Sequence, residues 1–324
     1  MVKINLEQNS RVRNGCWRGS FISSRQFFLF PCDAPFAKPV SRTSPEPLRH
    51  GSRMIQVSVV IITLNEEENI GKCLESVTRQ TFPRENIEII VVDNHSSDNT
   101  VSIARTYTDR VFTKGPERSP QKNFGVEQSR GIYILHLDGD MEIPEGLIRE
   151  CFELCERDRL VACYIPETVI GEGRWIKARN FERSFYDHTP ITAPRFIRRE
   201  TYLAAGGYDT ALIAGEDWDL DRRLRERGPT GYVTTPLLHN EGKLVMGRFM
   251  RSRAYYARHI GRYIEKWGSG DQLVKKQLGF RYRYFGVYLE QGKWKKLVRH
   301  PVLAAEMYLI KVSTGLQYLL HRNG

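Results

Sequence analysis

The run Val57–Thr63 (VSVVIIT) decides the fold of this chain. Seven successive residues, most of them β-branched, are typical of a strand that is buried on both faces. Strands of this kind occur in parallel sheets that carry helices on each side. The residues that follow, Asn65-Glu66-Glu67-Glu68, place a capping side chain and acids at a helix start, and apolar residues then recur at helical spacing.

Two further buried strands are predicted along the chain. Ile87–Val92 (IEIIVV) ends at Asp93, and Ile132–Leu137 (IYILHL) ends at Asp138. Helical patterns separate these strands, and such alternation predicts an α/β fold with a mostly parallel, Rossmann-like sheet flanked by helices. Ligands of such sheets bind at the carboxyl ends of the strands, where this sequence places Thr63, Asn65, Asp93 and Asp138.

The chain divides into three predicted parts. Residues 1–53 lack periodicity and are rich in Arg, Ser and Pro, which predicts a disordered N-terminal extension, with the ordered protein beginning near Met54. Residues 54–243 form the predicted catalytic domain. Residues 244–324 are predicted to be helical, basic and rich in aromatic side chains.

Charge is spread unevenly over these parts. The chain of 324 residues has a net charge of +11. Residues 241–324 carry 17 Lys/Arg and 5 Asp/Glu, a net charge of +12, and residues 1–53 carry 9 and 3, a net charge of +6. The central residues 54–240 therefore have a net charge of −7. An acidic centre argues against a nucleic-acid-binding core. It suits a catalytic domain whose basic flank can lie on anionic lipid.

The sequence also gives an expectation of location. It has no apolar run of about 18 or more residues, and Glu306 and Lys311 interrupt the apolar segment 301–320. Its six cysteines include no Cys-Xaa-Xaa-Cys pair, which fits a reducing compartment. We therefore expect a cytoplasmic protein that is peripheral on the inner face of the cell membrane.

Asp138-Gly139-Asp140 is the first candidate for chemistry. Two carboxylates two positions apart, with a glycine that permits close backbone approach, can share one Mn²⁺ or Mg²⁺ ion with a diphosphate. Such a cation would stabilise a departing nucleotide. The alternative is a polar turn that happens to contain two acids.

Glu216-Asp217 is the second candidate, at the start of a clear helical pattern. A carboxylate there is held ionised by the helix dipole and the free amides, so it could accept the proton of an attacking hydroxyl. The alternative is that both residues only cap the helix.

Several other residues could contact a ligand. Asp93 and Asn65 could bind a nucleobase edge or serve as loop caps, and the cluster that includes Lys122 and Asn123 could meet a donor diphosphate. His239 follows a strand predicted at 232–235 and could ligate the metal or contact phosphate. Acceptor sugars could stack on Trp175, Tyr186 or Trp218, although core packing is the favoured role for each of them.

Four segments together resemble the family 2 glycosyltransferases of the GT-A type. They are VSVVIITLNEEENIGKCLESV, IIVVDNHSSDNT, QKNFGVEQSRGIYILHLDGDM and GGYDTALIAGEDWDLDRRLRERG, and the resemblance runs from about Val57 to His239. It implies a GT-A fold and an inverting transfer by direct displacement. The Gln-Xaa-Xaa-Arg-Trp motif of the processive synthases is missing, which favours addition of a single sugar.

The resemblance also implies roles for single residues. Asp138 and Asp140 match the metal and diphosphate motif, Asp217 matches the catalytic base, and His239 matches a histidine sometimes found near the metal. Lys122 stands where the family commonly has Arg, which keeps the charge but loses the planar fork. The implied nucleotide-binding positions are Thr63, Asn65, Glu66 and Asp93.

The sequence therefore predicts an inverting, metal-assisted glycosyltransferase that uses a nucleotide-sugar, with UDP favoured. Its expected acceptor is a glycan or a polyprenyl-linked saccharide of the cell envelope. Two alternatives are a non-catalytic sugar-nucleotide- or polyanion-binding protein and a sugar nucleotidyltransferase. The second would be expected to have a glycine-rich, basic loop after the first strand, where this chain has Leu64-Asn65-Glu66-Glu67-Glu68.

Overall fold

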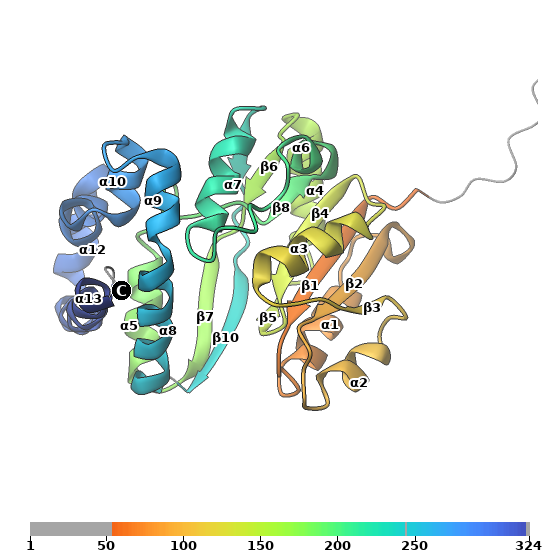
Figure 1. Cartoon of the computed structure of the whole chain (residues 1–324), viewed down its shortest axis with the longest axis horizontal. Coiled ribbons are helices and arrows are strands. Elements are labelled where there is room, and N and C mark those ends of the chain that lie inside the picture. Colours follow the sequence, from red (N-terminus) through yellow and green to blue (C-terminus); the bar gives the residue numbers. More distant parts are fainter. Residues whose placement is uncertain (1–53, 244, 322–324) are drawn as a thin grey trace, which may run out of the picture. The chain divides into compact units, whose positions relative to one another are not determined.

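The computed structural model describes residues 54–243 and 245–321. The predicted disorder of residues 1–53 lies outside the described residues. Between residues 54 and 321 the chain forms the expected α/β fold, in which a mostly parallel sheet is flanked by helices and followed by further helices (Figure 1).

The main sheet has seven strands in the order β3-β2-β1-β4-β8-β6-β9. The first four are parallel to one another, whereas β8 runs antiparallel to both β4 and β6. The strands are β1 (Val57–Thr63), β2 (Ile87–Asp93), β3 (Val111–Thr113), β4 (Tyr133–Asp138), β6 (Ala162–Tyr164), β8 (Phe196–Arg198) and β9 (Thr230–Tyr232).

Helices cover both faces of this sheet because successive residues of each strand point to opposite sides. Val59 and Ile61 of β1 face a core that includes Leu74 and Ile148, whereas Val60 faces a second core that includes Leu224. The helices of the two layers and their connections are α1 (Ile70–Thr78), α2 (Thr100–Arg105), α3 (Arg118–Glu127), α4 (Leu147–Arg157), α6 (Arg199–Ala204) and α7 (Glu216–Arg225), with a short 3-10 turn η1 (Arg84–Asn86).

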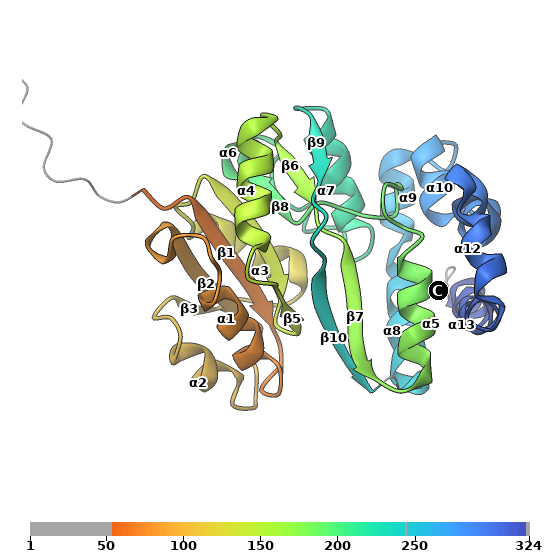
Figure 2. The same cartoon turned by 180° about the vertical axis from the view of Figure 1, so that it is seen from behind.

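A second sheet has the order β5-β10-β7 and lies between the main sheet and helices α5 and α8 (Figures 1 and 2). Its strands are β5 (Met141–Glu142), β7 (Glu167–Glu172) and β10 (Leu237–Lys243). Two sequence expectations were wrong here. The sequence of residues 171–200 predicts an irregular, aromatic and basic segment, but these residues contain the end of β7, helix α5 (Arg174–Arg183) and β8. The strand expected at 232–235 is replaced by β9 and β10, so that His239 lies inside a strand.

The C-terminal helices pack on α5 and on the loop before α7. Phe181 and Phe185 share one apolar cluster with Tyr288 and Met307, and a second cluster joins Leu212 to Tyr263. None of the helices among the described residues is long and apolar enough to span a bilayer. The elements are α8 (Met246–His259), α9 (Gly261–Trp267), α10 (Gln272–Leu278), the π-helical η2 (Tyr282–Gly286), α11 (Val287–Leu289), the 3-10 turn η3 (Glu290–Gly292), α12 (Trp294–Arg299) and α13 (Pro301–His321).

Candidate active site

The polar ends of three strands meet at one edge of the main sheet. In the parallel ladders Thr63 pairs with Asp93, and Ile62 pairs with Asp138. The carboxyl ends of β1, β2 and β4 are therefore neighbours, as the sequence predicted. The backbone after β4 passes close to β1, since a Cβ added to Gly139 would lie 2.9 Å from Oγ1 of Thr63. The glycine between the two acids is needed for this approach.

Asp138 and Asp140 have unused oxygen atoms at this edge. Oδ1 of each is buried and has no hydrogen-bond partner among the described residues. Oδ2 of Asp138 lies 3.6 Å from Nη1 of Arg195. Burial by itself would raise the pKa of Asp138, but Arg195, Lys122 and Arg118 together lower it below its ordinary value. Asp138 is therefore ionised at neutral pH.

These two oxygens fit a hard divalent cation whose coordination shell is completed by a substrate. No group of three His, Cys, Asp or Glu side chains within the described ranges is arranged to hold a metal by itself. Mg²⁺ is commonly bound through one or two carboxylates together with substrate phosphates, and a buried carboxylate oxygen without a partner is costly unless something binds it. The chemistry of Asp138 and Asp140 thus suits a cation that arrives with a diphosphate.

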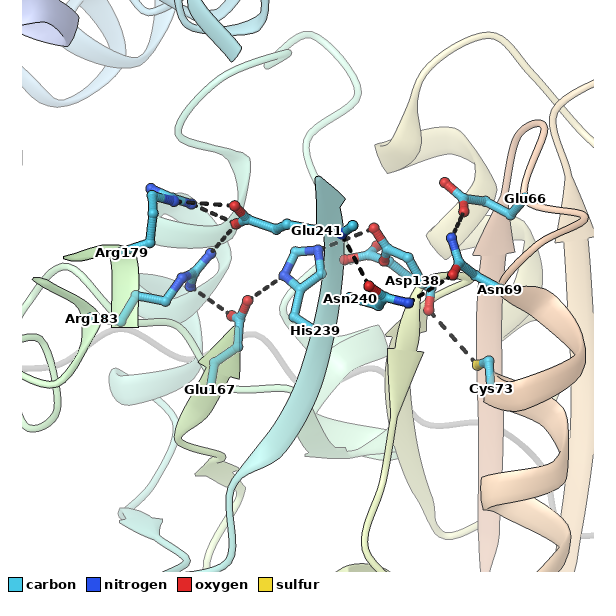
Figure 3. Close-up of polar contacts among 12 residues, drawn as sticks. Glu66, Asn69, Cys73, Asp138, Glu167, Arg179, Arg183, His239, Asn240 and Glu241 are labelled. Atoms are coloured by element: carbon cyan, nitrogen blue, oxygen red, sulfur yellow. Dashed lines mark hydrogen bonds and ion pairs between the residues drawn. The ribbon is translucent and has the colours of Figure 1, made fainter. Parts of the chain in front are cut away.

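His239 links the second acid to the neighbouring strand β7. Its Nε2 lies 3.1 Å from Oδ2 of Asp140, and its Nδ1 is hydrogen-bonded to Glu167 (Figure 3). Burial would lower the pKa of His239, but the two carboxylates raise it to about 10. In the absence of a cation the imidazole is protonated, so it acts here as a positive group that holds Asp140. Its role as a metal ligand stays a prediction.

The other end of the site is the start of α7. Gly215 has φ 81°, and a Cβ there would lie 2.7 Å from the ring of Tyr263, so glycine is required before the acidic pair. The side chain of Glu216 is 6% exposed and that of Asp217 is 45% exposed. Asp217 is therefore the carboxylate of the pair that a hydroxyl group can reach.

The two carboxylates have opposite pKa shifts. Burial and the neighbouring Asp217 raise the pKa of Glu216 to about 7. Burial would also raise the pKa of Asp217, but Lys122, Arg118 and Arg195 lower it well below its ordinary value. Nζ of Lys122 lies 3.2 Å from Oδ1 of Asp217, while Arg118 lies 3.7 Å from Glu216. At neutral pH the accessible acid carries the negative charge.

One cavity joins the two ends of the site. It has a volume of about 680 Å³, and Asp138, Glu216, Asp217 and His239 all line it. The pKa values of Asp138 and Asp217 are both lowered by Lys122, Arg118 and Arg195. Acids that are 79 positions apart in the sequence thus face one space and share the same cations. Asp140 lines a second cavity of about 640 Å³, together with Asn65 and Glu66.

Most of the nucleotide-binding candidates at the ends of β1 and β2 are hydrogen-bonded to residues in the loops that follow these two strands. Asp93 accepts a hydrogen bond of 2.8 Å from the backbone N–H of Ser96, and Oδ1 of Asn65 accepts one of 2.9 Å from Ser97. Glu66 accepts a bond of 2.7 Å from Asn69, which in turn accepts one from Asn240 of β10. The buried Oγ1 of Thr63 has no hydrogen-bond partner among the described residues, but Thr63 lines neither cavity, so its contact with a nucleotide stays a prediction.

Asn123 lies in a different setting from the one expected. Its Nδ2 donates to the carbonyl of Tyr208 at 2.9 Å, and its Oδ1 accepts from the Tyr208 N–H at 2.9 Å and from the Tyr202 hydroxyl at 2.5 Å. These bonds fix the Gly206-Gly207 turn against α3. The amide is engaged in structure, and its predicted contact with a nucleotide-sugar stays untested.

Sequence reasoning missed three arginines near the acids of the site, Arg179, Arg183 and Arg195. Arg195 reaches Asp138 from a segment that was expected to be irregular, and Arg179 and Arg183 of α5 pair with Glu241 and Glu167 (Figure 3). The signal for α8 was present, because Phe249, Ser252, Arg253 and Tyr256 follow one another at helical spacing and line the larger cavity. Of the aromatic candidates, Tyr186 and Trp218 line this cavity and Trp175 does not.

The comparisons with known sequences agree on one family. The model of the family "Glycosyl transferase family 2" matches residues 58–210. Glycosyltransferase AglE of Haloferax volcanii is 42% identical over 91 residues, which are 26% of this chain and 30% of that protein. A poly(ribitol-phosphate) beta-N-acetylglucosaminyltransferase TarS of Staphylococcus aureus is 29% identical over 175 residues, or 51% of this chain and 29% of its own length. The chain thus spans less than a third of these two relatives.

Solved structures share the fold. A mannosyltransferase PcManGT of Pyrobaculum calidifontis, solved with GDP-Man and Mn²⁺, has a TM-score of 0.54 at 18% identity and covers 83% of this chain and 86% of its own. Residues 1–349 of S. aureus TarS, solved with UDP, have a TM-score of 0.51 at 15% identity, with coverage of 83% and 90%. At these identities the likeness establishes the fold alone.

Proposed function

We propose that this chain, which belongs to glycosyl transferase family 2, is a nucleotide-sugar-dependent glycosyltransferase that inverts the configuration of the sugar that it transfers. The proposed donor is a UDP-sugar, with a GDP-sugar as the second choice. The relatives solved with UDP and with GDP-Man support testing both.

One observation carries this proposal. Asp138 and Asp217 line the same cavity, and the same three cations lower the pKa of both. An inverting transfer needs a group that stabilises the departing diphosphate and a base that faces it across the sugar. The acid at the end of β4 and the acid at the start of α7 would supply these two functions within one cavity.

The proposed reaction is a single displacement. Asp217 takes the proton of the acceptor hydroxyl while the oxygen of that hydroxyl attacks the anomeric carbon of the donor. The bond from the anomeric carbon to the diphosphate oxygen breaks, and the nucleoside diphosphate leaves. Asp138 and Asp140 would hold Mn²⁺ or Mg²⁺, which when bound neutralises charge on the departing nucleotide. Arg118 and Arg195 line the same cavity and add positive charge beside the diphosphate.

The proposed acceptor is a glycan or a polyprenyl-linked saccharide of the cell envelope. The relative named for poly(ribitol-phosphate), and a beta-monoglucosyldiacylglycerol synthase of Nostoc that is 22% identical over 263 residues, support testing a polymeric and a lipid acceptor. We place the enzyme on the cytoplasmic side of the cell membrane, as a peripheral protein whose C-terminal region of residues 244–324 contacts the bilayer. The basic charge of that region supports this placement.

A donor screen tests the proposal. The full chain is incubated with UDP- and GDP-sugars, with Mn²⁺, Mg²⁺ or EDTA, and nucleotide release and thermal protection are measured. We expect metal-dependent protection by one nucleotide, and loss of both protection and release in Asp140→Ala. Full release in Asp140→Ala or in EDTA would refute the metal role. Nucleotide binding without turnover of any donor would favour the non-catalytic alternative.

A further inference from the structure

Exposed apolar side chains are concentrated at the C-terminal end of the molecule. Eleven of the fifteen large apolar side chains that are exposed among the described residues lie between residues 280 and 320. They include Phe280, Phe285, Leu289, Trp294 and Val298, which precede α13. An exposed patch of this kind marks an interaction surface, because single exposed residues are normally scattered.

The rest of the patch forms a line along α13, which we term the α13 stripe. It consists of Val302, Ala305, Leu309, Val312, Leu316 and Leu319, all of them exposed. Their spacing alternates between three and four residues, so they share one side of the helix. In Figures 1 and 2, α13 lies at the margin of the helical layer, on the side away from the main sheet.

The opposite side of α13 faces the protein and the catalytic cavity. Met307 and Ile310 are buried, and Nζ of the buried Lys311 lies 3.0 Å from Glu182 of α5. Ile310, Lys311, Thr314 and Gly315 line the cavity that Asp217 also lines. One helix thus forms part of the cavity wall with one face and presents an apolar stripe with the other.

Unpaired positive charge lies in the segment that precedes the stripe in the chain. Residues 271–300 contain eight Lys/Arg and two Asp/Glu. Lys275, Lys276, Arg281, Lys295 and Arg299 are exposed, and none of them has a carboxylate partner among the described residues. Each Lys or Arg near a membrane that contains anionic lipid contributes about 1 kcal/mol of attraction. The patch therefore combines apolar area with the charge that complements anionic headgroups.

We propose that the α13 stripe lies in the headgroup region of a bilayer that contains anionic lipid, with the basic residues of 271–300 on the headgroups. This interfacial helix is then the partition between the membrane and the catalytic cavity. A lipid-linked acceptor held in the membrane would approach Asp217 along α13. Both parts rest on the proposed function: the first names the surface through which the proposed peripheral protein meets the bilayer, and the second names the route of its acceptor.

A second copy of the chain fits the stripe less well. The spacing of the stripe would suit a helix–helix seam, but such seams are usually flanked by exposed charges that set partner and register. Between residues 301 and 320 the only charged side chains are Glu306 and Lys311, and both are buried. The charged residues lie instead on the preceding segment, where they suit a planar anionic surface.

Vesicle binding tests the proposal. The full chain is sedimented with vesicles of phosphatidylcholine alone or with about one third phosphatidylglycerol. We expect at least about tenfold tighter binding to the anionic vesicles, and about tenfold loss of it in Leu309→Gln/Leu316→Gln. Leu203→Gln is the matched control, because Leu203 is 46% exposed on α6, away from the patch. The control should bind like the unchanged protein.

Two further measurements make the outcome decisive. Thermal protection by Mn²⁺ with UDP or GDP should be equal in the stripe variant and the control, so a failure of membrane binding is separate from a failure of the catalytic proposal. Lipids with brominated acyl chains should quench fluorescence in the unchanged protein but much less in Trp294→Phe. Equal vesicle binding by the stripe variant, no binding to anionic vesicles, or a dimer in solution that the stripe variant abolishes would overturn the proposal.

Discussion

The edge of the main sheet and the C-terminal helical layer are built in different ways. At the sheet edge, short polar segments follow buried strands, and the strand register brings Thr63, Asp93 and Asp138 together. In the helical layer, buried ion pairs such as Lys311–Glu182 join α13 to α5. The sheet edge and the start of α7 supply the proposed reacting groups, and the helical layer sets what can reach them. Substitutions in the two regions should therefore alter different measured quantities, among them kcat, KM and the free energy of unfolding.

The largest effect is expected at Asp217. Asp217→Asn removes the base but keeps the size of the side chain, so kcat should fall by about 10²–10⁴. Thermal protection by nucleotide and metal should persist, since Asp138 and Asp140 are unchanged. Steady-state kinetics and thermal unfolding on the same preparation check this. A variant that keeps more than a tenth of the activity would remove Asp217 from the mechanism.

The second effect, on stability, is expected in the helical layer. Lys311→Met leaves the buried Glu182 with less compensation, since Lys311 lowers the pKa of that acid against the effect of burial. Breaking a buried pair of this kind costs roughly 3 kcal/mol, which chemical denaturation measures. Lys295→Met is the matched control, because Lys295 is exposed and has no carboxylate partner among the described residues. If both variants unfold alike, the Lys311–Glu182 pair does not hold α13 to α5.

The same difference explains what the sequence could predict. The strands β1, β2 and β4 follow from their own apolar runs, and the acids at their ends follow from the geometry of parallel sheets. Helix α5 was missed because it buries Arg179 and Glu182, which disturb the apolar periodicity that reveals a helix. Strand β10 was misplaced because its inner residues are polar and pair with Asp140 and Glu167. Long-range ion pairs leave no local pattern.

The third effect concerns pH and the start of α7. The pKa of Glu216 is about 7 in the folded chain and 4.5 in its ordinary state. Between these values the unfolded chain loses a proton that the folded chain keeps, so Glu216 lowers the free energy of unfolding as pH rises from 4.5 to 7. The size is roughly 3 kcal/mol. Below pH 4.5 the effect is absent, and above pH 7 it is complete.

The variant Glu216→Gln isolates this effect because it cannot ionise. The stability of the variant relative to the unchanged protein should rise between pH 5 and pH 7.5, as measured by denaturant unfolding at each pH. Glu226→Gln serves as a control, since Glu226 is an exposed residue just beyond α7. A constant difference between Glu216→Gln and the unchanged protein across this range would mean that Glu216 is ionised throughout.

The smallest effect tests the point where the two regions meet. Arg253 of α8 lines both cavities, and its guanidinium lies 4.8 Å from the ring of Phe249. Among the described residues no carboxylate forms a hydrogen bond or close ion pair with it, and Glu182 and Glu241 act on it only at longer range. An unpaired guanidinium that faces Asp138 and Asp140 across these spaces suits a phosphate group of a substrate. Arg253→Ala should raise KM for the donor or the acceptor about tenfold, or about 1.4 kcal/mol, and change kcat little. Arg258→Ala, at an exposed position on the same helix, should change neither constant. A fall in kcat with constant KM would instead place Arg253 among the groups that act on the transition state, and would show that the helical layer takes part in the chemistry as well as in access.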